Sequence, residues 1–299
     1  MQLCCMNLFS LFLDKLEKEE LFTQREIRFV NCSEILKQEL SKTTLSKYCK
    51  KFNVNKGTLH YMIHGKRAIY FDLVSIEKIN NEKTRVLLKN ATIPIKIPET
   101  LTQELAYLIG MLRDGSVMKE KNDEYTCVFY SKYSDALNII REYLKKVFDV
   151  QSTIENNKED LFQVRVRSKT LYYFLKVMFE TKEKQVDWKT PDLIKQSNAL
   201  IKKWYVRGFW DAEGGCPHNV NKKKKDLEVK FSQKNRESLE FIKQFLNSIN
   251  IKTGNVYWNK DTFVLKITQS HIPQFQMVIG SSHPVKAKRL EEVAKVFVH

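Results

Sequence analysis

The pattern of hydrophobic and polar positions repeats within the chain. In the first copy, FYSKYSDALNIIREYL (from Phe129) reads as a strand end followed by an amphipathic helix, and FQVRVR (from Phe162) alternates as a half-buried strand. FSQKNRESLEFIKQFL (from Phe231) and FVLKIT (from Phe263) repeat the pattern in the second copy. Similar segments in the same order indicate an internal duplication. Each copy is predicted to run helix, strand pair, helix, strand pair, helix.

The first 90 residues follow a different pattern. TTLSKYCKKFNVNKGTLHYMIHGKR (residues 43–67) has apolar residues at helical spacing on both sides of Asn53-Val54-Asn55. It resembles a helix-turn-helix of the phage-repressor type, whose second helix would begin near Lys56 and enter the major groove of DNA, with Lys66 and Arg67 at its end. A small helical bundle without DNA contact is the alternative. We therefore predict a helical domain at 1–90, a proline-punctuated linker at 91–100, and two halves at 101–190 and 191–299.

Charge indicates the kind of partner. The chain has 299 residues, with 51 Lys and Arg against 35 Asp and Glu, and a formal net charge of +16. An excess of this size is typical of proteins that bind polyanions such as nucleic acids. No apolar run is long enough to span a membrane, and the six cysteines are scattered without zinc-site spacing. We expect an intracellular, cytoplasmic protein associated with the nucleoid, without a membrane partner.

The candidate DNA-binding side chains lie mainly on the predicted strands. In FQVRVR, Gln163, Arg165 and Arg167 share one face because strand side chains alternate. A solvated polar face is the alternative interpretation. The run NKKKKD is either an exposed loop or a phosphate-contacting finger. The full set of candidates is Gln163, Arg165, Arg167, Lys222, Lys223, Lys224, Lys225, Lys230 and Lys266, with Lys56, Lys66 and Arg67 near the N-terminus.

The stretch VRGFWDAEG (residues 206–214) combines two features that normally destabilise a buried helix. Gly208 lies in the helix interior, which is tolerated when another backbone approaches closely. Asp211 and Glu213 follow it, and buried carboxylates need partners. YLIGMLRDG (residues 107–115) stands at the corresponding place in the first copy and carries Asp114. Two such helices in contact would bring one carboxylate from each to a shared divalent metal, an arrangement that hydrolyses phosphodiesters.

With these motifs, the duplicated part resembles a single-chain, two-motif LAGLIDADG homing endonuclease. The resemblance implies an α+β fold: two pseudo-symmetric αββαββα halves forming a saddle of antiparallel sheets on DNA, here beside a small all-α N-terminal domain. It implies that Asp114 and Glu213 are the catalytic metal ligands for Mg²⁺, with Mn²⁺ as a substitute. It places Ser131-Lys132 and Gln233-Lys234 where family members orient water, so Lys132, Lys234 and Gln233 are catalytic candidates. Asp211 is expected to cap or pair at the helix interface.

The first motif departs from the family pattern. Ile109 takes the third position, Gly110 follows one place later, and Arg113 stands where a small residue is usual. We expect this irregularity to shift or splay the contact between the helices.

Two alternatives to an enzyme that cuts DNA stay open: a catalytically weak or inactive DNA-binding regulator, and an RNA maturase that assists splicing of an intron RNA. The prediction is a monomeric, site-specific double-strand DNA endonuclease. It would hydrolyse one phosphodiester per strand within a long asymmetric target.

Overall fold

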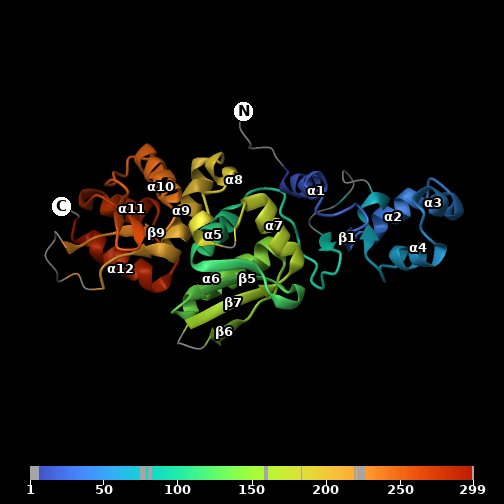
Figure 1. The fold of residues 1–299 in the computed structure, drawn as a ribbon, viewed down its shortest axis with the longest axis horizontal. Helices are drawn as coiled ribbons and strands as arrows, with labels where there is room; N and C mark the ends of the chain where they lie inside the picture. Colours follow the sequence, from blue (N-terminus) through green and yellow to red (C-terminus); the bar gives the residue numbers. More distant parts are fainter. Residues whose placement is uncertain are drawn as a thin grey trace.

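The computed structural model describes residues 7–74, 79, 83–157, 161–182, 184–218, 220 and 226–297. Three units follow one another along the longest axis (Figure 1): an N-terminal region at one end, the first half in the centre and the second half at the other end. Both halves combine helices with antiparallel sheets, so the predicted α+β class and the duplication are confirmed.

The first half has the predicted order of helices and strands. Its sheet runs β4-β5-β7-β6, and every neighbouring pair is antiparallel. Its elements are α5 (Gln103–Met111), the short helix η4 (Leu112–Asp114), β4 (Gly115–Lys119), η5 (Lys121–Asp123), β5 (Tyr125–Ser131), α6 (Ser134–Phe148), β6 (Ile154–Asn157), β7 (Leu161–Arg167) and α7 (Lys169–Phe179).

The second half repeats this topology, with strand order β10-β11-β9-β8. The sequence offset between the copies makes Lys266 the counterpart of Arg165. The elements are α8 (Asp192–Lys195), α9 (Ala199–Glu213), β8 (Gly214–Gly215), β9 (Lys230–Gln233), α10 (Arg236–Ser248), β10 (Tyr257–Asn259), β11 (Thr262–Lys266), η8 (Gln269–His271), α11 (Ile272–Val278) and α12 (Pro284–Lys295), preceded by η6 (Gln185–Asp187).

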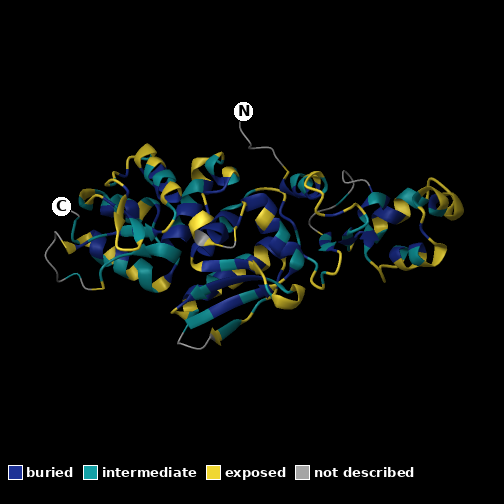
Figure 2. Cartoon of the chain, viewed as in Figure 1, coloured by how far each residue is buried: buried dark blue, intermediate teal, exposed yellow. Residues whose placement is uncertain are grey.

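The core lies where the halves meet and between each sheet and its helices. Residues 105–111 of α5 are all buried, as are most residues in the C-terminal half of α9 (Figure 2). Along β7, Val164 and Val166 are buried in the hydrophobic core, which leaves the alternate residues for the opposite face of the sheet. The predicted alternation of FQVRVR is therefore confirmed.

The N-terminal region is not all-α, so that part of the predicted fold is wrong. A three-stranded antiparallel sheet runs β2-β1-β3 beside its helices. β1 has a clear period of two, because Ile27 and Phe29 are fully buried while Arg28 and Val30 are half-buried. The elements are α1 (Leu8–Lys18), β1 (Ile27–Val30), α2 (Ser33–Leu40), α3 (Leu45–Phe52), α4 (Lys56–Ile63), β2 (Ile69–Tyr70), η2 (Phe71–Leu73) and β3 (Arg85–Leu88).

The stretch at 91–100 connects the N-terminal region to the first half as a packed segment. Ile95 and Ile97 are buried, and Ile95 forms a β-bridge with Val86. The amide of Lys96 donates to the carbonyl of Phe148 at 2.9 Å. Among the described helices, none combines the length and the apolar character needed to cross a membrane.

Candidate active site

The two motif helices, α5 and α9, cross in direct backbone contact. A Cβ on Gly208 would collide with the carbonyl oxygen of Tyr107, and one on Gly110 would collide with that of Tyr205. Each glycine therefore faces the main chain of the opposite helix, and neither position has room for a side chain. The expectation that the displaced glycine of the first motif splays the helices is wrong.

Glu213 is the last residue of α9, and Asp114 is the last residue of η4, the short helix that follows α5; each stands immediately before the first strand of its own sheet. The pKa of Glu213 is raised to about 7, mainly because its carboxylate is buried and further because the negative charge of Asp114 is nearby. Asp114 is reached by solvent, yet the surrounding protein desolvates its carboxylate and raises its pKa to about 6. The structure therefore brings the two predicted carboxylates together into one electrostatically coupled pair.

Lys286 of α12 supplies a positive charge at this point. Its Nζ donates to four main-chain carbonyls at the end of α9, including Asp211 O at 2.7 Å and Gly214 O at 2.8 Å. Burial lowers the pKa of Lys286, while the charges of the nearby carboxylates oppose that shift. The ammonium caps α9 and partly offsets the negative charge of Asp114 and Glu213.

Asp211 has the structural role predicted for it. Its side chain is only 3% exposed. It accepts hydrogen bonds from the Tyr107 hydroxyl at 2.8 Å, from the amides of Ser282 (2.8 Å) and His283 (3.2 Å), and from the Ser281 hydroxyl. These contacts join α5, α9 and the turn that starts α12. Asp211 therefore positions the segment that carries Lys286.

The candidate residues at the strand ends differ in whether they contact the acidic pair. Gln233 is buried, and its Nε2 donates to Glu213 Oε1 at 3.2 Å. Lys234 and Lys132 are exposed, and among the described residues neither side chain forms an ion pair with Asp114 or Glu213. Ser131 is buried and accepts from the amide of Tyr133 at 3.0 Å. Only the second half thus places its strand-end side chain on the acidic pair.

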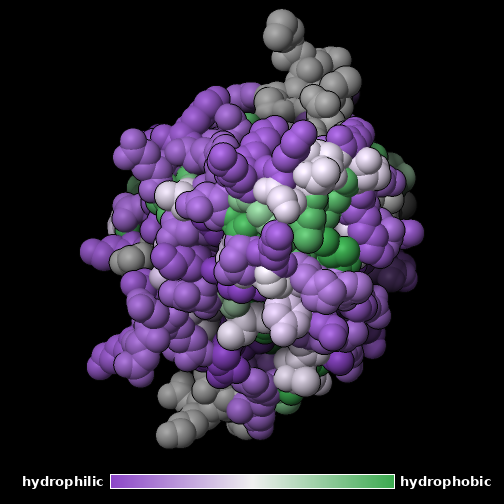
Figure 3. Space-filling model, turned by 90° about the vertical axis from the view of Figure 1, so that its right-hand side faces the viewer, coloured by the Kyte–Doolittle hydropathy of each residue, from purple (hydrophilic) through white to green (hydrophobic). Residues whose placement is uncertain are grey.

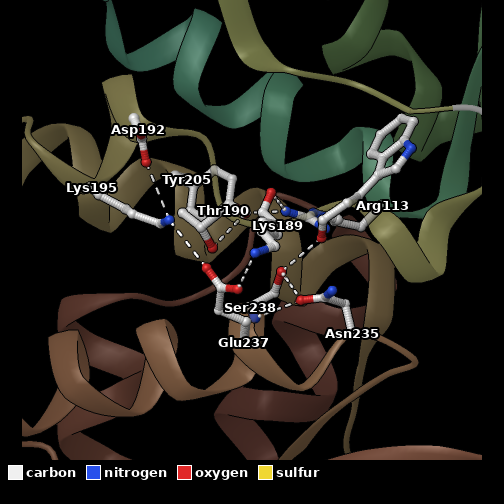
Figure 4. Close-up of polar contacts among 10 residues, drawn as sticks. Arg113, Lys189, Thr190, Asp192, Lys195, Tyr205, Asn235, Glu237 and Ser238 are labelled. Atoms are coloured by element: carbon white, nitrogen blue, oxygen red, sulfur yellow. Dashed lines mark hydrogen bonds and ion pairs between the residues drawn. The ribbon is translucent and has the colours of Figure 1, made fainter.

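Arg113, the irregular residue of the first motif, is buried between the halves (Figure 4). Its guanidinium donates to the carbonyls of Trp188 and Lys189, the latter at 2.8 Å, and to the Tyr205 hydroxyl at 2.9 Å. The Trp188 carbonyl also accepts from Ser238 of α10 at 3.0 Å. Arg113 therefore ties the first motif to the segment connecting the halves and, through it, to the second half.

The predicted DNA-facing residues of the two sheets are held by glutamates. Arg165 forms an ion pair with Glu120 at 2.8 Å, and its counterpart Lys266 forms one with Glu228. Arg167 pairs in the same way with Glu124 from the β4–β5 connection.

The other strand candidates differ. Gln163 is buried and donates to Glu155 at 2.9 Å, while Lys230 is half-buried and lies opposite Lys266 in the sheet. Lys222, Lys223, Lys224 and Lys225 lie outside the described residues. Lys56, Lys66 and Arg67 are exposed in the N-terminal region.

The acidic pair suits a hard divalent cation. Two desolvated carboxylates, one of which raises the pKa of the other, favour a bound positive charge, and Mg²⁺ is commonly held by one or two carboxylates together with waters and substrate phosphates. The described residues contain no cluster of three or more His, Cys, Asp or Glu side chains that would form an all-protein metal cage. The donors present therefore fit a cation that shares its coordination with DNA phosphate.

Sequence reasoning missed Lys286, Ser281 and His283. These residues follow the matched part of the repeat, and no local pattern links them to the acidic pair. The one available signal was Asp211, a buried carboxylate whose partners had to come from elsewhere in the chain.

Comparisons with known proteins identify a family and relatives for this chain. The family described as "LAGLIDADG-like domain" matches residues 201–280. Homing endonuclease I-ApeI of Aeropyrum pernix is 33% identical over 196 residues, which cover 63% of this chain and 86% of that protein. An uncharacterised protein of Methanocaldococcus jannaschii is 28% identical over 191 residues, covering 61% of this chain and 66% of that protein.

A crystal structure of I-DmoI in complex with DNA and Mn aligns with 62% of this chain and 99% of its own, at 22% identity and a TM-score of 0.47. The sequence relationship to I-ApeI, which covers most of that enzyme, establishes the family. The chain belongs to the LAGLIDADG homing endonuclease family.

Proposed function

We propose that this protein is a monomeric, site-specific endonuclease that hydrolyses one phosphodiester in each strand of duplex DNA and uses Mg²⁺ held by Asp114 and Glu213. The observation that carries the proposal is the buried junction of the two motif helices, where a carboxylate from each half is coupled to the other. A single chain supplies both carboxylates, so no second copy is needed. The homing-endonuclease relative supports duplex DNA as the substrate.

The residues of the site have separable tasks. A bound Mg²⁺ or Mn²⁺ would polarise the scissile phosphate and activate water. Asp114 and Glu213 would bind the metal. Each stands before the first strand of its own half, so each half would position one DNA strand for cleavage. Gln233 holds the Glu213 carboxylate in orientation through its 3.2 Å hydrogen bond. The positive charge of Lys286 opposes the rise in the pKa of both carboxylates and so partly offsets the repulsion between them.

The sheets supply the surface that would hold DNA over the metal site. Arg165 and Lys266 occupy equivalent positions on the two halves, so the basic surface repeats with the pseudo-twofold relation of the fold. Their glutamate partners fix the side chains before DNA arrives, which reduces the entropy lost on binding. A long target that differs between its two halves follows, because the equivalent positions carry different residues.

Cleavage of a randomised duplex library in Mg²⁺ tests the proposal. Wild-type protein is expected to yield ends that share one long site. EDTA, Glu213→Gln and Asp114→Asn should each abolish these ends, with a rate loss of more than about 100-fold for each variant, because a direct metal ligand contributes more than an outer-shell partner. Glu142→Gln is the matched control, because Glu142 is an exposed carboxylate on α6.

The alternatives give different outcomes in the same assay. Selective retention of one duplex without cleavage would replace the endonuclease with a DNA-binding regulator. Failure to select any duplex, together with acceleration of the splicing of an intron RNA, would replace it with a maturase.

A further inference from the structure

The N-terminal region contains a second surface with the geometry of a DNA reader. α3 ends at Phe52 and is followed by the C-cap residue Asn53, whose φ of 49° reverses the chain in the left-handed region. Val54 is buried in the turn, and Asn55 caps α4 by accepting from the amide of Thr58 at 2.6 Å. A helix, a short turn with a left-handed residue and a second helix form the helix-turn-helix arrangement that places the second helix in the major groove.

α4 has one buried and one exposed face. Leu59 and Met62 are fully buried, whereas His60, His64 and Tyr61 are exposed. Tyr61 is 53% exposed, so its phenol is accessible to a partner. Imidazole and phenol groups can form hydrogen bonds with base edges. His60 and Tyr61 stand on the helix that would enter the groove, and His64 caps its C-terminal end.

The charge around α3 and α4 has one sign. Residues 43–67 include six basic side chains and no Asp or Glu. All six are exposed, and among the described residues none forms an ion pair: Lys47, Lys50, Lys51, Lys56, Lys66 and Arg67. This contrasts with the sheets of the two halves, where Arg165 and Lys266 are each held by a glutamate. Figure 3, which looks onto the N-terminal end of the molecule, shows a mostly hydrophilic surface.

The N-terminal region is firmly attached to the first half. Phe12 of α1 packs edge-on against Phe174 of α7, with ring centroids 5.3 Å apart. Arg85 of β3 forms an ion pair with Asp149 at 2.8 Å, beside the backbone contact of Lys96. Because these contacts come from three separate segments, the N-terminal region that carries α4 is packed against the first half rather than joined to it by a flexible tether.

We propose that α3 and α4 form a second DNA-binding site, which takes the major groove of the same duplex beyond the first half. This inference rests on the proposed function, because it assumes that DNA lies along both halves. The three units form a row (Figure 1), so a duplex that runs from the second half across the first continues toward the N-terminal region. Recognition therefore extends past the cleavage site on one side only.

Photo-cross-linking of the full-length protein tests direct contact. A benzoylphenylalanine in place of Tyr61 should cross-link to a labelled random-sequence duplex. The same group in place of Met277 should not, because Met277 is 76% exposed on α11, a helix packed on the core side of the second sheet. The test does not need cleavage, so it is run in a Glu213→Gln background. Absence of a cross-link at position 61 overturns the inference even when the protein cuts DNA.

Flanking DNA tests the claim of a single duplex. Targets recovered by cleavage selection are extended by about two helical turns on one side, on the other side, or on neither. The cross-link at position 61 should require the extension on one particular side. Cross-linking that is independent of the flanks would mean that a separate duplex binds, which overturns the inference. If cleavage selection recovers no target, cross-linking of position 61 to the random-sequence duplex still shows whether α4 contacts DNA. Failure of the proposed endonuclease function can therefore be told apart from failure of this inference.

Salt dependence gives a measure of the phosphate contacts. The triple variant combines Lys56→Gln, Lys66→Gln and Arg67→Gln. In a plot of the logarithm of the DNA-binding constant against the logarithm of the salt concentration, its slope should be smaller in magnitude by about 2 to 3, because each lost phosphate contact removes about 0.9. The control removes three charges from the exposed side of α6, with Arg141→Gln, Lys145→Gln and Lys146→Gln. Equal effects of the two triple variants would overturn the inference.

Discussion

Gly208 of α9 lies directly against the main chain of Tyr107 on α5, so that even a methyl group would collide with the Tyr107 carbonyl oxygen. The atoms in contact are main-chain atoms of Tyr107, in the buried part of α5, so they cannot shift without disturbing the packing of the core. Gly208→Ala is therefore expected to lower the free energy of unfolding by about 3 kcal/mol, at the upper end of the cost of overpacking. Denaturant unfolding of the full chain measures the change.

Gly57→Ala is the matched control for this effect. Gly57 lies in the exposed helix α4, where a Cβ would meet only Asn55 Oδ1 at 3.6 Å. The substitution should raise the free energy of unfolding by about 0.5–1 kcal/mol, because alanine favours a helix over glycine. If Gly208→Ala and Gly57→Ala changed stability alike, the close helix crossing would be contradicted.

Asp211 and Glu213 are two residues apart on α9 and should respond oppositely to loss of charge. Asp211→Asn removes a buried acceptor of four hydrogen bonds, so we expect a loss of about 2–4 kcal/mol in the free energy of unfolding. Glu213→Gln removes a carboxylate whose ionisation is disfavoured in the apo protein, so stability at pH 8 should be unchanged or higher. Paired unfolding and cleavage measurements separate the two residues.

The assignment of tasks depends on that separation. Glu213→Gln should be folded and inactive, and Asp211→Asn should be destabilised while retaining measurable cleavage at low temperature. An Asp211→Asn protein of normal stability without cleavage would make Asp211 part of the chemistry instead.

His283 makes the docking of α12 sensitive to acid. Burial, together with the charge of Lys286 and, more weakly, that of Arg289, lowers the pKa of His283 to about 4. Between about pH 6.5 and pH 4, His283 is therefore protonated in the unfolded chain but largely neutral in the folded chain. Stability should fall as the pH drops from 7 to 5, by roughly 2 kcal/mol from this residue. Denaturant unfolding at the two pH values measures the loss.

His283→Asn is the comparison for the acid effect. His283 Nδ1 accepts from the amide of Lys286 at 3.4 Å and caps α12. Asparagine is a good N-cap that does not titrate in this range. The difference in stability between the wild type and His283→Asn should change with pH, in favour of the variant under acid conditions. If the free energy of unfolding changed with pH in the same way for the two proteins, His283 would not be the cause of the acid sensitivity.

The acidic pair and the duplicated halves were predictable because local sequence encodes them. The glycine and carboxylates of VRGFWDAEG lie within one helix, and strand alternation such as that of FQVRVR has a period that a short window reveals. The splayed contact was predicted wrongly for a physical reason. Gly110 meets the main chain of Tyr205, so the opposite helix accommodates the one-residue displacement.

Other features depend on contacts between distant segments. β1 has only four residues, so its alternation is too short to identify a strand from the sequence, and its pairing with β2 and β3 involves distant segments. The Lys286 ammonium contacts the end of α9 from α12, and Asp211 binds the turn before that helix. The glutamate partners of Arg165 and Lys266 likewise come from neighbouring parts of the sheet.

Lys286→Met tests whether the buried ammonium belongs to the chemistry of the site. Methionine keeps much of the length of the side chain but removes the charge that offsets Asp114 and Glu213. Cleavage should slow by about 10–100-fold, as for a residue that tunes metal ligands from outside the coordination sphere. Mg²⁺ should bind as tightly or more tightly, because the competing positive charge is gone. Single-turnover cleavage and Mg²⁺ titration of the folded variant give the two quantities.

Lys288→Met is the control, because Lys288 is exposed on the same helix and should leave both quantities unchanged. Loss of four donated hydrogen bonds at the end of α9 should also destabilise Lys286→Met. Stability alone therefore does not decide the role of the lysine, whereas the metal titration does. Weaker Mg²⁺ binding in Lys286→Met would mean that the site has lost its shape, and Lys286 would then be a helix cap without an electrostatic part in cleavage.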